Sequence, residues 1–145
     1  MREVNLRDTH SAIRENILSL QQAAYAVAFV EQATETETPL IAIYELVRGF
    51  LDCLCKHKPA SQIIFAFELK LLRELGLEPD WSKTGLAAGT KKSVAALTQK
   101  DWASGLRLRL TKEQTVELRQ FLHGFLIFHL GRLPRGRAAA LADGS

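Results

Sequence analysis

The sequence predicts an all-α fold, a compact bundle of about four longer helices plus one or two short helices. Three observations support this class. Apolar residues recur at intervals of three and four along most of the chain, which is the period of an amphipathic helix. Residues that commonly begin and end helices separate these segments. No set of alternating segments that could pair as a sheet is present, so a helical bundle is the simplest architecture.

The first helix is expected to start at Asp8 or Thr9, either of which can cap a helix. One apolar face follows at steps of four, three, four and three, and we expect it to face the core; its members are Ile13, Ile17, Leu20, Ala24 and Val27. The polar, β-branched stretch 34–37 should end this helix. Thr38 and Pro39 then suit the N-cap and first position of a second helix.

The second helix carries an apolar stripe and ends near residues 56–58, whose cations complement a helix C-terminus, before Pro59. Its stripe comprises Ile43, Leu46, Val47, Phe50, Leu51 and Leu54. A third helix is predicted over 60–75, with Ile64, Phe67, Leu71 and Leu75 on its inward face. Gly76 is placed for the left-handed C′ position, Leu77 for the hydrophobic contact after it, and Pro79 prevents continuation.

The second half begins with a loop over 78–92 and a short helix over 91–100, with Val94 and Leu97 facing inward. Residues 101–105 form either a turn or another short helix. Residues 106–110 alternate strictly, which formally predicts a strand, but a lone strand has no pairing partner. We therefore expect an extended linker there.

The last long helix is predicted to start at Thr111, which forms a capping-box pattern with Gln114, and to run to about Leu130. Gly131 ends it. Its inward face is expected to comprise Leu118, Phe121, Leu122, Phe125 and either Phe128 or His129. A basic exit segment, 132–137, follows, and residues 138–145 are expected to be frayed.

Composition restricts the protein class. The 145 residues are 47% hydrophobic and 24% charged, enough for one globular domain with a real core. No apolar run reaches the length of a membrane span, and residues 1–8 lack the apolar core of a signal peptide. Two cysteines are too few for a disulfide-stapled secreted scaffold. We expect a cytoplasmic protein with no membrane partner.

No group of residues predicts catalysis, a metal or a cofactor. Cys53 and Cys55 are two apart on a helix and point about 200° away from each other, and at least one is expected to be buried. The four histidines show no metal-ligand spacing. The phenylalanines of the last helix could stack nucleobases, but their spacing favours a core stripe. Trp81 and Trp102 are either exposed anchors or covers for the core edge.

Charge is distributed unevenly although the net charge is only +3. Residues 1–55 carry four basic and eight acidic side chains, whereas residues 107–145 carry seven basic and three acidic ones. An arginine-rich end is typical of a surface that faces a polyanion. A solvated surface on an ordinary domain explains the same bias, and charge alone favours that interpretation.

Four segments in this order and spacing resemble the C-terminal helical domain of the RecO family of recombination mediators. The most specific is Phe65 to Pro79, with its phenylalanine-glutamate-leucine-lysine-leucine-leucine run ending in glycine. Residues 106–111, the close at Phe128 to Arg132 and the earlier stretch Gln22 to Ala26 also fit. The resemblance covers roughly Val4 to Leu141. It implies a single RecO-like helical domain over 1–141, followed by a frayed tail at 142–145.

The resemblance implies a non-enzymatic role in recombinational repair, in the cytoplasm and associated with the nucleoid. RecO-like proteins bind single- and double-stranded DNA and promote strand annealing. They engage the acidic, apolar C-terminal tail of single-stranded DNA-binding protein, and with RecR they help to load RecA. The competing interpretation from the residues is a structural or protein–protein interaction module with no DNA contact. A small-molecule-binding bundle ranks last, because the predicted core stripes are almost wholly apolar.

Two departures from the family pattern matter. The chain has no room for the N-terminal oligonucleotide-binding barrel that contributes to DNA and RecR binding in the family, so DNA binding should be weak for this domain alone. The sequence leaves open whether such a barrel exists in a longer protein. Many family members also carry a four-cysteine zinc site, but the matching region, Glu78 to Lys92, contains no cysteine. We therefore expect no zinc.

Arginines of the last third are the candidate contacts to DNA phosphates or to the acidic tail beside an apolar groove. These candidates are Arg107, Arg109, Arg132, Arg135 and Arg137. Lys70 and Arg73 are secondary candidates, expected on the outer face of the third helix. For each arginine the alternative is a solubilising surface charge or a local pair with Glu113 or Glu117.

Overall fold

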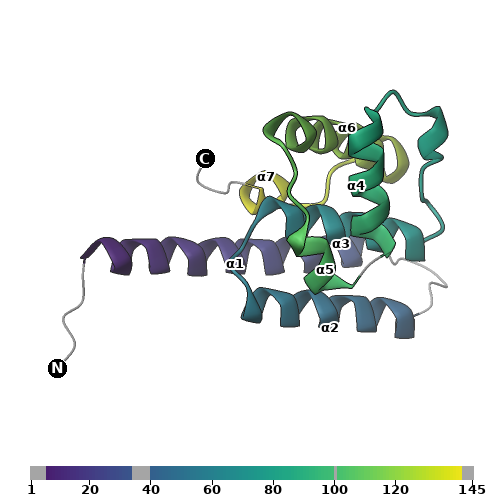
Figure 1. Ribbon diagram of the computed structural model, residues 1–145. Helices are drawn as coiled ribbons and strands as arrows, with labels where there is room; N and C mark the ends of the chain where they lie inside the picture. Colours follow the sequence, from purple (N-terminus) through teal and green to yellow (C-terminus); the bar gives the residue numbers. More distant parts are fainter. Residues whose placement is uncertain (1–5, 34–39, 100, 142–145) are drawn as a thin grey trace.

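The computed structural model describes residues 6–33, 40–99 and 101–141, and these residues form helices and loops with no strand (Figure 1). The long helices are α1 (Leu6–Ala33), α2 (Leu40–Lys56), α3 (Ser61–Glu74), α4 (Ala88–Gln99) and α6 (Lys112–Leu130). The short ones are α5 (Trp102–Arg107), α7 (Arg137–Ala140) and the 3₁₀ turn η1 (Trp81–Lys83). The predicted all-α class is confirmed. Five described helices are long rather than four, because α4 begins three residues before the predicted start.

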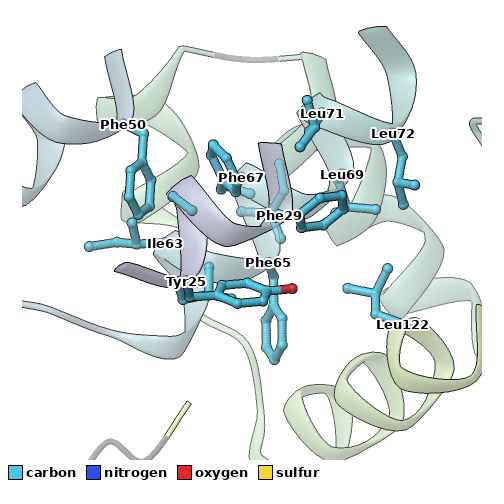
Figure 2. Packing of buried hydrophobic residues seen from close by; sticks show 14 of the residues in the cluster. Tyr25, Phe29, Phe50, Ile63, Phe65, Phe67, Leu69, Leu71, Leu72 and Leu122 are labelled. Atoms are coloured by element: carbon cyan, nitrogen blue, oxygen red, sulfur yellow. The ribbon is translucent and has the colours of Figure 1, made fainter. Parts of the chain in front are cut away.

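Helix α3 is the centre of the molecule. Its residues 63–72 are apolar almost without interruption, and a helix that is apolar all round must be buried. Helices α2, α4 and α5 pack on it, and the Phe67 ring lies 4.7 Å from Phe50 of α2 and 6.1 Å from Phe29 of α1, between ring centroids (Figure 2). The spacing of its apolar residues predicted one inward face on this helix; in the structure, residues on all sides of it contribute to the core.

Helix α1 buries the face opposite to the predicted one. Ile17, Leu20 and Val27 are 49%, 70% and 50% exposed, whereas Tyr25 and Phe29 are fully buried. The prediction failed because this helix has two apolar faces, and the core takes the one with aromatic rings, which bury more area. The helix also begins at Leu6, so Asp8 and Thr9 lie inside it. The predicted helix end at 34–37 and the cap at 38–39 lie outside the described residues.

The end of α2 and both ends of α3 agree with the prediction to within one or two residues. Helix α2 ends at Lys56; its stripe is mostly buried or half-buried, with Leu51 exposed. Beyond α3, Gly76 has a positive φ of 74°, and the amide of Leu77 donates to the Leu72 carbonyl at 2.8 Å. Only glycine adopts this conformation without steric cost, so the predicted C-terminal cap is confirmed.

Helix α6 begins with the predicted capping box and ends at Gly131, which has a φ of 82°. Leu118 and Leu122 are buried as expected, and Phe121 and Phe125 are half-buried against the core. The expectation that Phe128 or His129 faces inward is wrong, since both are exposed. The buried row instead continues at steps of four to its next member, Leu126.

The remaining expectations divide between confirmed and wrong ones. Val94 and Leu97 of α4 are buried as predicted. The extended linker predicted over 106–110 is correct only for residues 108–110, because residues 106 and 107 form the last part of α5. Trp81 and Trp102 are half-buried against the core and cover its edge.

Residues 138–141 are not frayed: α7 packs on α1, and Leu141 is only 1% exposed. Residues 142–145 lie outside the described part of the chain. None of the described helices is long and apolar enough to cross a membrane.

Candidate nucleic-acid interface

Arg137 is buried rather than offered to solvent. Its Nε donates to Oε2 of Glu68 at 2.7 Å and its Nη2 donates to Oε1 at 3.2 Å. The hydroxyl of Tyr25 donates to the same Oε2 at 2.5 Å. Burial alone would lower the pKa of Arg137, but the Glu68 carboxylate outweighs it and holds this pKa above its ordinary value. The prediction that Arg137 contacts DNA is therefore corrected: its guanidinium anchors α7 to α3.

Arg132 and Arg135 lie together on the segment between α6 and α7. Gly131 and Gly136, with φ of 82° and 90°, allow the sharp turns at its two ends. The side chain of Gln32, near the end of α1, donates to the Arg132 carbonyl at 2.9 Å. This bond fixes the segment against α1, with both arginine side chains exposed.

These two arginines line one hollow of about 650 Å³, which we call the arginine hollow. Its lining residues are Ala28, Glu31, Gln32, Arg132, Leu133 and Arg135. Two guanidinium groups against one carboxylate leave a net positive charge there. Guanidinium groups bind phosphate and carboxylate through paired hydrogen bonds, so the lining of this hollow is chemically suited to an anion.

Arg107 and Arg109 are both exposed, at the end of α5 and in the linker that follows. The side chain of Gln62 on α3 donates to the carbonyls of Gly105 and Leu108 at 2.6 and 2.8 Å, which fixes this stretch to the core. The leucines that alternate with these arginines are half-buried, which explains the alternation in the sequence; they are Leu106, Leu108 and Leu110. Neither of these two arginines lines the arginine hollow.

Lys70 and Arg73 differ in their surroundings. Arg73 is exposed as expected. Lys70 is half-buried: its Nζ lies 5.3 Å from the centroid of the Trp102 ring and donates to the carbonyl of Thr98 at 3.3 Å. Burial is the main cause that lowers the pKa of Lys70. The nearby carboxylate of Asp101 acts in the opposite direction, and Arg73 adds a smaller contribution that lowers this pKa. The expectation that Lys70 lies on the outer face is therefore corrected.

An aromatic groove runs along α6, where the sequence favoured a core stripe of phenylalanines over an exposed aromatic surface. The rings of Trp81, Phe121, Phe125 and His129 follow one another at centroid distances of 5.3, 5.7 and 4.1 Å. The last three line an open hollow of about 440 Å³ together with the segment after α3. The sequence did carry a signal, a spacing of four from 121 to 125 to 129, but the same spacing is typical of a core stripe. His129 is three residues before Arg132, so the groove ends close to the arginine hollow.

Among the described residues, no group of three or more histidine, cysteine or acidic side chains is arranged to hold a metal ion. The region that corresponds to the zinc loop, residues 78–92, forms η1 and the start of α4. Cys53 is buried and Cys55 exposed, so the prediction that at least one cysteine is buried is confirmed.

Comparison with known proteins gives two matches. The family model described as recombination protein O C terminal matches residues 14–87, about half of the chain. The DNA repair protein RecO of Exiguobacterium sibiricum is 29% identical over 70 residues, which are 48% of this chain and 28% of that protein. No solved structure gives a significant match. The residues matched by the family model include Lys70 and Arg73 but end before Arg107, so the match does not cover the two arginines of the arginine hollow.

Proposed function

The chain belongs to the recombination protein O C-terminal family, a family of DNA repair and recombination, and we propose that it acts there as a non-enzymatic domain that binds DNA phosphates without reading sequence. Arg132 and Arg135 would make the main contacts, and Arg107 and Arg109 would add a second site. The observation that carries this proposal is the placement of two exposed guanidinium groups in one hollow, on a segment fixed to α1. Phosphate contacts of this kind position a protein on DNA but do not specify a base sequence.

The acidic tail of single-stranded DNA-binding protein is the second proposed ligand. Its carboxylates would lie over the arginine hollow, and an aromatic or aliphatic end would enter the aromatic groove at Phe121 and Phe125. The two surfaces are joined through the last turn of α6, between His129 and Arg132. Acidic segments are commonly recognised by clustered arginines, with an apolar pocket that selects the side chain at the end.

With RecR, such a domain would support the loading of RecA in the nucleoid. DNA and tail would compete for the arginine hollow, because both are polyanions. A domain that exchanges one for the other can release coating protein at the place where it holds DNA. No step of this exchange requires catalysis by the chain.

Fluorescence anisotropy with labelled single-stranded DNA tests the DNA proposal. We expect weak binding, and the logarithm of the association constant should fall linearly with the logarithm of the salt concentration. The double variant Arg132→Gln, Arg135→Gln should weaken binding and reduce the salt slope by roughly 1.4, because each phosphate that is no longer neutralised lowers the slope by about 0.7. Arg119→Gln, an exposed arginine on α6 outside both sites, is the control and should leave most of the binding intact.

The same titration with a peptide that carries several acidic residues and a terminal phenylalanine tests the tail proposal. Phe125→Ala should weaken the binding of the peptide more than the binding of DNA, because only the peptide is expected to contact the aromatic groove. Binding of neither ligand at low salt, or equal effects of the control and the double variant, would exclude both roles.

A protein–protein module with no DNA contact is the alternative function. The exposed apolar side chains on α1 and α2 favour it, since helix faces of this kind are typical of docking surfaces. In that case the double arginine variant would leave partner binding unchanged, and DNA would not bind at any salt concentration.

A further inference from the structure

The outer face of α1 is an apolar stripe that no described part of the molecule covers. Ile17, Leu20 and Val27 are 49%, 70% and 50% exposed, and Ala24 between them is also exposed. Their spacing of three, four and three residues is that of a coiled-coil seam. Soluble proteins seldom leave a contiguous apolar stripe of this length in water without a partner.

This stripe lies opposite to the face that α1 uses in the fold. Tyr25, Ala26 and Phe29 are fully buried against the domain, and successive residues on a helix rotate by about 100°, so the two faces point nearly 180° apart. The first half of α1 also extends beyond the other helices (Figure 1). A second helix can therefore approach the stripe without disturbing the core.

We propose that the stripe is the contact between two copies of this chain, paired through antiparallel α1 helices. With the two-fold axis at position 22, Ile17 of one copy faces Val27 of the other, and Leu20 faces Ala24. Each large side chain meets a smaller one, which brings the helix axes close together. A two-fold pairing of this kind is closed, so association stops at the dimer.

The charges at the ends of the stripe favour this orientation. Arg14 and Glu31 are both exposed, and neither forms an ion pair with another described residue. The antiparallel pairing places Arg14 of each copy one residue from the position that faces Glu31 of its partner. A parallel pairing would instead place the two Glu31 carboxylates against each other, which is repulsive.

Sedimentation of the full chain from about 1 μM to about 1 mM tests the proposal, and we expect a monomer–dimer equilibrium within this range. Leu20→Glu should raise the dissociation constant at least about tenfold, because it buries a charge in the seam. Leu51→Glu, at an exposed apolar position on α2, is the matched control and should leave the equilibrium unchanged. Circular dichroism verifies that both variants keep the helical fold.

Cross-linking tests the orientation. In a Cys55→Ser background, a tagged Leu20→Cys chain is mixed with an untagged Ala24→Cys chain and oxidised. The antiparallel seam predicts mainly the mixed disulfide, whereas a parallel seam predicts mainly each chain with itself. A chain that stays monomeric at the highest concentration, a dimer insensitive to Leu20→Glu, or self-linked products would each overturn the proposal. None of these results depends on DNA binding, so the proposed function is tested separately.

Discussion

Arg137 and Glu68 form a two-point ion pair in the interior, with side chains only 3% and 0% exposed. The pair joins α7, the last described helix, to the central helix α3. The hydroxyl of Tyr25 on α1 donates a hydrogen bond to the same carboxylate, so α1 is held there as well. Because the pair fixes α7, it also determines where the preceding segment and its two exposed arginines lie.

Breaking this pair should destabilise the protein strongly. Arg137→Met leaves a carboxylate buried without its cation, and we expect a loss of about 3–5 kcal/mol in the free energy of unfolding. The double variant Glu68→Leu, Arg137→Met should lose much less than the sum of the single losses. Urea unfolding of the wild type, Arg137→Met, Glu68→Leu and the double variant measures these losses. The control is Lys56→Met, which removes an exposed pair with Asp52 and should cost less than about 1 kcal/mol.

Stability should depend on Tyr25 at high pH. Burial, and then the Glu68 carboxylate, raise the pKa of Tyr25 well above its ordinary value, so the hydroxyl stays protonated in the folded protein. The unfolded chain loses this proton above about pH 10, so it then binds fewer protons and stability falls by about 1.4 kcal/mol per pH unit. Tyr25→Phe lacks this component, although it costs about 1–3 kcal/mol at neutral pH because the hydrogen bond to Glu68 is absent.

The measurement is urea unfolding of wild type and Tyr25→Phe at several pH values between about 8 and 11. The advantage of the wild type should be constant below about pH 9 and should shrink above about pH 10. Parallel curves over the whole range would contradict the prediction.

The two thiols should react at very different rates. Burial is the main cause that raises the pKa of Cys53 to about 11, so little thiolate is present at pH 8, and access is blocked as well. Cys55 is exposed and should react with a disulfide reagent more than about a hundredfold faster. Cys55→Ser should leave only the slow phase, which is replaced by a single fast phase when urea unfolds the chain. Two equally fast thiols in the native protein would be inconsistent with a buried Cys53.

The start of α6 should depend on its capping box. The Thr111 hydroxyl accepts from the Gln114 amide at 3.0 Å, and the Gln114 side chain accepts from the Thr111 amide at 2.9 Å. Thr111→Ala removes one of these bonds and should cost about 1 kcal/mol in urea unfolding. Thr111→Ser keeps the hydroxyl and should cost only a few tenths of that amount. Equal losses for alanine and serine would show that the cap does not stabilise the helix.

Local signals predicted most of the fold. The Thr111 capping box, the Gly76 cap and the end of α2 near Lys56 all depend on residues within a few positions of one another. The sequence can predict such helix ends because the backbone hydrogen bonds at a helix end must be satisfied by nearby residues. The apolar row of α6 failed only in its last turn, where the choice between Leu126 and Phe128 depends on the neighbouring helix.

The candidate site was predicted in part. Arg132 and Arg135 are exposed and line one hollow, whereas Arg107 and Arg109 are exposed but do not line it. Arginine clustering in the sequence could find all four, but it could not separate Arg137 from them. That residue differs only in having Glu68, which is 69 positions away, as a buried partner.

The sequence by itself determined the helical class, the caps at Gly76, Thr111 and Gly131 and the family resemblance, because each depends on short-range spacing. Tertiary structure decided which apolar face of α1 is buried, since both faces have helical spacing and only packing against α3 selects the one with Tyr25 and Phe29. It also decided that Arg137 is structural and that Arg132 and Arg135 share a hollow with α1. These outcomes depend on contacts between residues far apart in the chain, and the energies of such contacts do not appear in any local pattern.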